Sequence, residues 1–258
     1  MAIRITAALR NFLLRDGAFK NAFQNGIIKV FTGSQPATAE AAETGTLLLK
    51  FTKASGAHTN EVLATGTLTV TGSLPGTFTS VTVNSVELLS GTVTGVTDLA
   101  TTAAAIAQNI NDNINVPEYT ASSSGAVVTI KAAPGSGTTP NGWTVAATTT
   151  GTLTYSKTDM TGGVAAANGL IWGPVSAGKI VKGSDVWSGV GLANGTAGWF
   201  RALPATSDPG TLDSSELYMR LDGNISTSGA NSNWTSTSVV IGATVTADEF
   251  KITLPASG

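Results

Sequence analysis

The chain has 258 residues, a net charge of −2 and no cysteine, and 12% of its residues are charged, about half the share in a typical soluble domain. Fourteen Lys and Arg against sixteen Asp and Glu leave no basic field for nucleic acid, and the lack of cysteine excludes disulfides, thiolate metal sites and cysteine nucleophiles. Abundant Thr, Ser, Gly and Ala favour β-structure with a weakly charged surface, which suits packing in a fixed assembly.

The N-terminal segment has the spacing of an amphipathic helix. Ile5, Leu9, Phe12 and Leu13 stand at i, i+4, i+7 and i+8, which places them on one helical face. We expect this helix to end at residues 16–17, where Asp precedes Gly. Its apolar face can cover the protein's own sheet or a partner subunit, so Phe12 and Leu13 are candidate interface residues.

The same segment resembles a secretory leader only in part. Arg10 and Arg15 interrupt the apolar run that a signal peptide needs. No stretch of the chain has the roughly 18 uninterrupted apolar residues of a membrane-spanning helix. We therefore expect the N-terminus to be retained and the protein to have no membrane partner.

Two strands with a corner between them are expected next. Residues 18–23 suggest a further helical turn, and the apolar runs at 27–31 and 46–51 read as strands. Gly and Pro at 33–36 force a corner, because Pro fixes φ and cannot continue a β-ladder. The alanine-rich residues 37–42 are predicted to form one helical turn.

After residue 51 the chain becomes a Thr-rich series of short strands around one helix. Asp98, with its neighbour Thr97, is placed to cap that helix, whose apolar stripe is Leu99, Ala103, Ile106 and Ile110. The order predicts a two-layer α+β unit with one helix on a small sheet. In sequence, the expected elements are strands at 64–72 and 79–91, a helix at 99–110, a hairpin at 118–132 that turns at 124–125, and two strands within 141–158.

The C-terminal part reads as strands again, joined by Gly, Asn and Pro turns. The fold class predicted for the whole chain is therefore mainly β. Strands are expected at 195–203, 216–223, 235–242 and 248–255.

Three stretches of the sequence resemble a family of tailed-bacteriophage virion proteins. They are "FKNAFQNGIIKVFTGSQPATAEAAETGTLL" (19–48), "NGTAGWFRAL" (194–203) and "RLDGNISTSGANSNWTSTSVVIGATVTADEFKITLPA" (220–256). The family's members carry an "IYSGTQP…TGTLL" opening, a "TGTAGWFR" strand and an "LT.PA" type of ending. The resemblance covers residues 15–51 and 165–258, and it implies a structural role with no catalytic residues to carry over.

The intervening stretch resembles a different module. "TDLATTAAAIAQNINDN", "EYTASSSGAVVTIKA" and "NGWTV" are similar to a β-α-β module that recurs in phage tail proteins, including contractile sheaths. The two resemblances together imply a discontinuous, β-sandwich-like docking domain with an N-terminal helix, residues 1–60 plus 165–258. An α+β module, residues 61–164, is inserted at a loop of that domain, where insertions are tolerated.

Two groups of residues bear on chemistry. His58, the only histidine, has no Cys or clustered carboxylate near it in the sequence, so we expect a loop histidine and not a general base or ligand. The acidic group Asp208, Asp213, Glu216 and Asp222 offers oxygen ligands for Ca²⁺, but its spacing matches no known loop and the alternative is a solvated loop. No phosphate-binding or dinucleotide motif occurs. We therefore predict no enzyme activity and no catalytic, cofactor or metal residues.

The five tryptophans leave a further alternative open. They could line a sugar-binding platform, although Trp199, within "AGWFRAL", and Trp143, in an alternating strand, are better placed for a core or an interface. Trp187 and Trp234 are candidate interface residues.

The sequence thus predicts a non-enzymatic structural component of a tailed-phage virion, first of all a capsid decoration or cementing protein. The alternatives are a tail, neck or baseplate protein and, from another class, a glycan-binding adhesin or depolymerase. Expected partners are the major capsid protein or tail and neck proteins, together with copies of the chain itself in a homo-oligomer. The expected location is the virion, after synthesis in the cytoplasm of the bacterial host.

Overall fold

The computed structural model shows a mainly β protein, with 47% of residues in strands and 11% in helices, which confirms the predicted fold class. The chain divides into two compact units: residues 1–61 with 166–258, called here the discontinuous unit, and residues 62–165, called the inserted unit. Each boundary lies one residue beyond the position expected from the sequence. The structure describes residues 3–15, 18–114, 116–210, 213–214 and 217–253.

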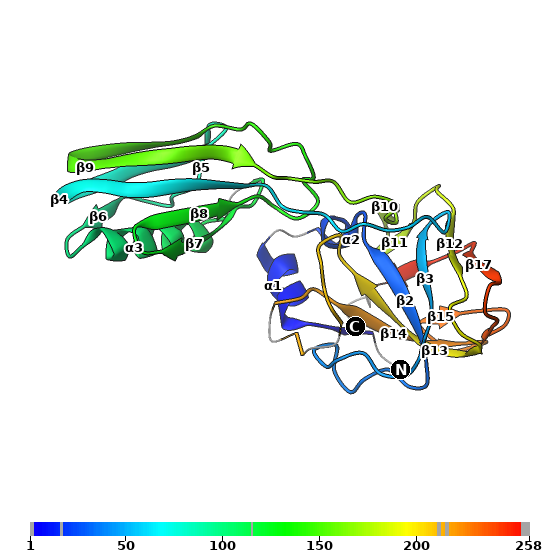
Figure 1. Cartoon of the computed structure of the whole chain (residues 1–258). Helices are drawn as coiled ribbons and strands as arrows, with labels where there is room; N and C mark the ends of the chain where they lie inside the picture. Colours follow the sequence, from blue (N-terminus) through cyan, green and yellow to red (C-terminus); the bar gives the residue numbers. More distant parts are fainter. Residues whose placement is uncertain (1–2, 16–17, 115, 211–212, 215–216, 254–258) are drawn as a thin grey trace. The chain divides into compact units, whose positions relative to one another are not determined.

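The discontinuous unit is built on a large, almost wholly antiparallel sheet with strand order β1-β14-β13-β2-β3-β12-β17, to which β15 and β16 add at β14 and β13 (Figure 1). A second sheet has the order β10-β11-β18. The helices are α1 (Ala7–Arg15) and α2 (Phe19–Phe23), and the strands are β1 (Arg4–Ile5), β2 (Ile27–Thr32), β3 (Leu47–Lys53), β10 (Trp172–Ser176), β11 (Lys179–Lys182), β12 (Trp187–Val190), β13 (Gly195–Leu203), β14 (Leu221–Ser226), β15 (Ser232–Asn233), β16 (Ser238–Val239), β17 (Thr244–Ala247) and β18 (Lys251–Thr253).

The N-terminal helix exists but begins later than its apolar spacing suggested. Ile5 belongs to β1, where it pairs with Leu221, and the helix starts at Ala7. Leu9 is fully buried, while Phe12 and Leu13 are partly buried and pack against the core of the same unit. The expected helix end at residues 16–17 lies outside the described residues.

The strands predicted after residue 194 differ in extent. The segment 195–203 forms a strand as predicted. The next strand begins at Leu221, residues 217–220 are not part of it, and the expected start at 216 lies outside the described residues. Within 235–242 only Ser238–Val239 pairs, and of 248–255 only Lys251–Thr253 does so among the described residues. Apolar alternation without a neighbouring strand of matching length does not make a ladder, which explains the shortfall.

The predicted helical turn at 37–42 is wrong. Arg201 Nη1 and Nη2 donate to the carbonyl oxygens of Ala41 and Ala39 at 3.0 and 3.2 Å, and Arg220 Nη1 donates to those of Glu40 and Ala41 at 3.0 and 3.2 Å. These carbonyls therefore accept hydrogen bonds from distant strands in place of helical N–H groups. Because both guanidinium groups are buried, the bonds fix the 33–46 loop in a non-helical path over the sheet.

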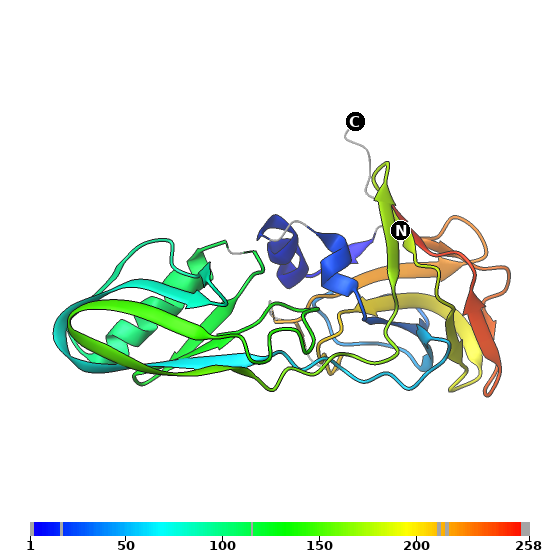
Figure 2. The ribbon, with the colours of Figure 1, turned by 90° about the horizontal axis from the view of Figure 1, so that it is seen from above.

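The inserted unit consists of one six-stranded sheet and one helix (Figure 2). The helix lies along one face of the sheet, and a separate core of buried aliphatic and aromatic side chains fills the space between them. The elements are β4 (Thr65–Val83), β5 (Val86–Glu87), β6 (Val93–Gly95), α3 (Leu99–Asp112), β7 (Thr120–Ser124), β8 (Val127–Lys131) and β9 (Val145–Thr161).

The helix α3 confirms its sequence prediction. Ala103, Ile106 and Ile110 are buried, and the Asp98 carboxylate accepts a hydrogen bond from the backbone N–H of Thr101 at 2.6 Å. That bond satisfies one of the free N–H groups of the first turn. The hairpin β7–β8 also forms, with its turn one residue later than expected, at Gly125 and its successor.

The inserted unit has fewer and longer strands than the sequence indicated. The expected strands 64–72 and 79–91 are largely one strand, β4, and the two expected within 141–158 are one strand, β9. The two strands pair along almost their whole length, with register shifts beside Gly72 and Gly76. Gly72 has a φ of +83° and Gly151 one of +72°. These glycines therefore lie at irregularities within the continuous β4–β9 pair and do not end the strands.

Candidate functional site

A row of charged side chains crosses the large sheet of the discontinuous unit. Strand register places Lys50 opposite Lys29, Lys29 opposite Arg201, Arg201 opposite Asp222 and Asp222 opposite Arg4. Directly opposed residues of antiparallel strands point to the same face. The sheet therefore presents four cations and one carboxylate in a line on one face.

Most of this charge is neutralised within the protein. Arg201 Nε and Nη2 donate to the two carboxylate oxygens of Asp222 at 2.8 and 2.7 Å, and both side chains are fully buried. Lys29 Nζ lies 2.7 Å from Glu43 of the 33–46 loop, and Arg4 donates to the Pro36 carbonyl of the same loop. Burial raises the pKa of Asp222, and the hydrogen bonds and charge of Arg201 act against that rise.

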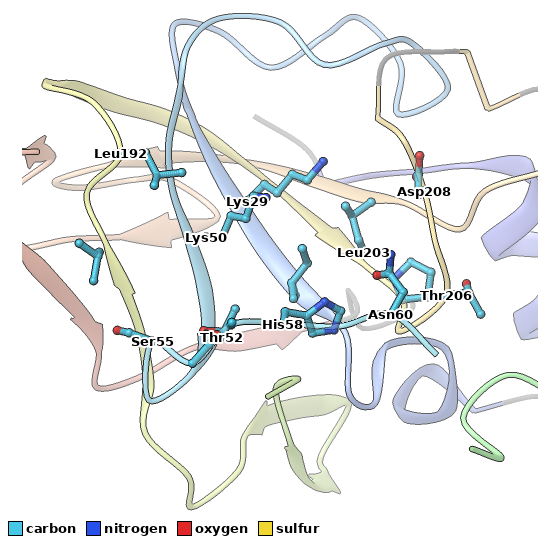
Figure 3. Close-up of a pocket in the computed structure, with 15 residues that line it drawn as sticks. Lys29, Lys50, Thr52, Ser55, His58, Asn60, Leu192, Leu203, Thr206 and Asp208 are labelled. Carbon is cyan, nitrogen blue, oxygen red and sulfur yellow. Dashed lines mark hydrogen bonds between the residues drawn. The ribbon is translucent and has the colours of Figure 1, made fainter. Parts of the chain in front are cut away.

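Lys50 is the exception in the row. Its side chain is exposed, and among the described residues it has no hydrogen-bond or ion-pair partner, unlike Lys29 beside it. The Lys50 side chain lines a pocket of about 480 Å³ on the same face of the sheet (Figure 3). Aliphatic groups of Ile27, Leu203 and Pro204 form part of the lining.

Two of the hydroxyl side chains that line the pocket are bonded to their own chain. Ser55 Oγ lies 2.8 Å from Ser188 Oγ, and the Thr52 hydroxyl donates to the Gly56 carbonyl at 2.8 Å. A hydroxyl that is held in this way has less capacity left for a ligand. Of the charged residues that line the pocket, Lys29 is paired with Glu43 and Asp208 with Arg220, so the ammonium group of Lys50 is the one that favours an anion.

His58 lies in the loop after β3 and lines the same pocket, as Figure 3 shows. Its Nε2 is 3.2 Å from the Asn25 carbonyl oxygen, so Nε2–H is the donor. Burial lowers the pKa of His58, the hydrogen bond to Asn25 raises it, and the positive charge of Lys50 lowers it further. The net direction is downward from 6.5, so the imidazole is neutral at neutral pH and adds no charge to the pocket.

An exposed aliphatic surface adjoins the pocket. Val190, Leu192, Val240 and Ile241 keep 41%, 52%, 54% and 59% of their surface exposed, and we call these four residues the aliphatic rim. Val190 and Leu192 also line the pocket. Large aliphatic side chains gathered in this way on a protein surface mark interaction sites.

Backbone hydrogen bonds hold the rim together. Gly191 N–H donates to Ala243 O, and Gly242 N–H donates to Gly191 O, both at 2.8 Å, so the two rim segments run side by side. The approach is close enough that a Cβ at Gly191 would lie 2.1 Å from the Val240 carbonyl oxygen. Leu192 N–H is bonded to Leu48 O at 2.7 Å, which ties the rim to β3.

The tryptophans expected at an interface or a sugar platform are mostly in the core. Trp187 is fully buried, packs edge-on against Trp172 at 4.9 Å and donates its Nε1–H to Asp185 at 3.0 Å. Its placement at an interface is therefore corrected, because no part of its ring is exposed. Trp234 is partly buried against Phe51, at a ring distance of 5.8 Å.

The acidic residues considered for Ca²⁺ are not gathered around one point. Arg220 Nε and Nη2 donate to the Asp208 carboxylate at 2.7 and 2.8 Å, and Asp222 pairs with Arg201. Asp213 is exposed, and Glu216 lies outside the described residues. Among the residues that the structure describes, no three His, Asp or Glu side chains lie close enough together to hold a metal ion.

Comparisons with known proteins identified no relative. The chain matches no family model, and neither the curated proteins nor the solved structures compared with it gave a match. Within the described residues, no helix is both long and apolar enough to span a membrane.

Proposed function

We propose that the protein is a non-enzymatic structural component of a tailed-bacteriophage virion, which acts by repeated symmetric contacts with its neighbours. The first placement is on the capsid, as a decoration or cementing protein that contacts the major capsid protein and further copies of itself. The virion is then its location, after synthesis in the host cytoplasm.

The aliphatic rim is the observation that carries the proposal. A chain with so few charged residues exposes four large aliphatic side chains on two segments that backbone hydrogen bonds fix in place. A single contact through such a surface has only modest affinity. A virion repeats the contact at every symmetry-related position, so multivalency makes it effectively permanent.

The sequence resemblance supports the same class of function. The stretches that resemble virion proteins include β2, β3 and β13, which form the sheet beside the pocket. A tail, neck or baseplate position is the second candidate, because α3 and the β7–β8 hairpin belong to the stretch that is similar to modules of phage tail proteins.

The adhesin alternative loses most of its support. It depended on tryptophans that could stack on sugars, whereas Trp172, Trp187 and Trp199 are buried. A buried indole has no free face for a sugar ring. The high threonine content of the strands is the remaining argument for an adhesin. Threonine occurs in the sheets of proteins with many functions, so we do not propose this alternative.

Copy number in purified particles tests the proposal. The protein should appear in a stained gel of virions freed of host protein, with a copy number comparable to that of the major capsid protein if it decorates the capsid. A copy number matching a single ring would replace decoration by the tail or neck position. Absence from particles of the phage that encodes it would refute the structural role.

A further inference from the structure

We propose that the pocket around Lys50 and the aliphatic rim form one docking site for an extended segment of another virion protein. In that complex a carboxylate side chain of the segment pairs with Lys50, and an aliphatic side chain beside it covers Val190 and Leu192. Only the description of the partner as a virion protein rests on the proposed function. The chemistry of the site does not.

Charge complementarity is the first argument for a carboxylate. Lys29 is neutralised by Glu43 and Asp208 by Arg220, and His58 is neutral. The positive charge of Lys50 is therefore the charge in the pocket that no described group neutralises. An ammonium group at the mouth of a partly apolar pocket pairs with an anion more favourably than one on a fully solvated surface.

The extent of the apolar surface is the argument for a protein and against a small carboxylate. Val240 and Ile241 are exposed but do not line the pocket. A ligand confined to the pocket would leave both side chains in water. A peptide segment that enters the pocket and continues over the rim covers all four, which is the pattern of an interface with a central anchor.

The chain's own exposed carboxylates fit this site poorly. Glu249 pairs with Lys251, Asp159 pairs with Lys157, and Asp98 caps α3. Asp213 and Asp248 are also exposed, but Asp213 precedes the buried Ser214, whose N–H donates to Glu40 O at 2.7 Å, and Asp248 is flanked by Ala247 and Glu249 and by no large aliphatic side chain. An extended segment of another protein meets neither restriction.

His58 supplies a local probe of the site, because it is the only histidine in the chain and lines the pocket. The full-length protein, labelled with ¹³C and ¹⁵N, is titrated with the blocked hexapeptide acetyl-Gly-Leu-Val-Glu-Leu-Gly-amide. The imidazole resonances of His58 and the methyl resonances of Val190 and Leu192 should shift together along a saturable curve, with half-saturation on the order of 1 mM. The same peptide with Gln in place of Glu should bind about fivefold more weakly.

Matched variants separate the site from general effects. Lys50→Gln should weaken binding of the Glu peptide about fivefold and abolish the preference for Glu over Gln. Lys53→Gln is the control, because Lys53 is also exposed but lies three residues along β3, on the opposite face. Leu192→Ala should weaken binding of both peptides, whereas Val175→Ala, at an exposed position on β10, should leave it unchanged.

A second readout comes from the ionisation of His58. The charge of Lys50 helps to lower the pKa of His58, so a bound carboxylate should raise that pKa, and the Gln peptide should not. Equal binding of the two peptides, or undiminished binding by Lys50→Gln, would overturn the proposal.

Two further outcomes would also overturn it. Shifts of His58 that grow with protein concentration in the absence of peptide would assign the site to a second copy of the chain. Binding of acetate as tight as that of the Glu peptide would assign it to a small carboxylate. Each of these results would leave the presence of the protein in virions untouched, so failure of this inference is distinguishable from failure of the proposed function.

Discussion

The two units stabilise their sheets in different ways. The discontinuous unit buries ion pairs between strands and a loop far apart in the sequence, such as Arg201 with Asp222. The inserted unit pairs threonines across neighbouring strands, with the Thr67 and Thr158 hydroxyls 2.8 Å apart and those of Thr71 and Thr154 also 2.8 Å apart. A buried charge that loses its partner is costly, whereas an exposed hydroxyl that loses one is solvated by water. The first unit should therefore respond strongly to single polar substitutions, and the second should respond mainly to changes in its apolar core.

Removal of one member of the buried ion pair should have the largest effect. Asp222→Ala leaves the Arg201 guanidinium charged and without its carboxylate, and we expect it to destabilise the discontinuous unit by about 3–5 kcal/mol. The measurement is thermal unfolding followed by tryptophan fluorescence, because Trp172, Trp187 and Trp199 are buried in this unit. The pair variant Asp222→Leu with Arg201→Met is the control, and it should recover much of the loss. A single variant as stable as the parent protein would contradict the account of this unit.

A cavity beneath α3 should have the next largest effect, in the other unit. Ile106→Ala removes a fully buried side chain, and we expect a loss of about 3 kcal/mol. Amide hydrogen exchange should show lost protection in β4, β8 and α3, while β2 and β13 keep theirs. Gln108→Ala, at an exposed position of the same helix, is the matched control. Equal loss of protection in both units would show that they do not unfold independently.

Acidification should weaken the discontinuous unit slightly. The folded state lowers the pKa of His58 below 6.5, so the unfolded state binds a proton at a higher pH than the folded state does. The stability is fully present above about pH 6.5 and falls as the pH drops through 6.5 toward the folded-state pKa. Because His58 is half-buried, solvent screening keeps the loss under about 1 kcal/mol. Urea unfolding at a series of pH values should show this slope, and His58→Gln should flatten it.

The threonine pairs should contribute least. Thr71→Val keeps the shape and β-propensity of the side chain but breaks the hydroxyl contact with Thr154, and we expect a change within about 0.5 kcal/mol. The transition of the inserted unit in a urea titration measures it. A loss comparable to that of Ile106→Ala would mean that hydroxyl pairing, and not the apolar core, holds this sheet together.

The two units also differ in how far the sequence predicted them. The helix α3 followed from its apolar stripe and its Asp98 cap, and β13 from a largely apolar run bounded by turn residues, because each depends on nearby residues. The glycines within β4 and β9 resembled strand ends, since a bulge and a turn use the same residue. Residues 37–42 resembled a helical turn because their deciding partners, Arg201 and Arg220, lie about 160–180 residues further along the chain.

The candidate site was missed for the same reason. Lys50 looked like one charged residue in an apolar strand, and only strand register shows that its neighbours in the charged row are neutralised elsewhere. The rim had a weak local signal, because exposed aliphatic residues flank Gly191 and precede Gly242. Their meeting depends on hydrogen bonds between segments about 50 residues apart. Trp187 failed as an interface residue because an aromatic side chain is equally suited to a core.

The position of the chain in a reconstruction of the intact virion tests the central claim most directly. The account predicts density for the discontinuous unit at a symmetry-repeated position, with Val190, Leu192, Val240 and Ile241 in contact with a neighbouring subunit and a carboxylate beside Lys50. A particle in which these residues face solvent would contradict the docking site. A particle in which no density fits the chain would contradict the proposed function itself.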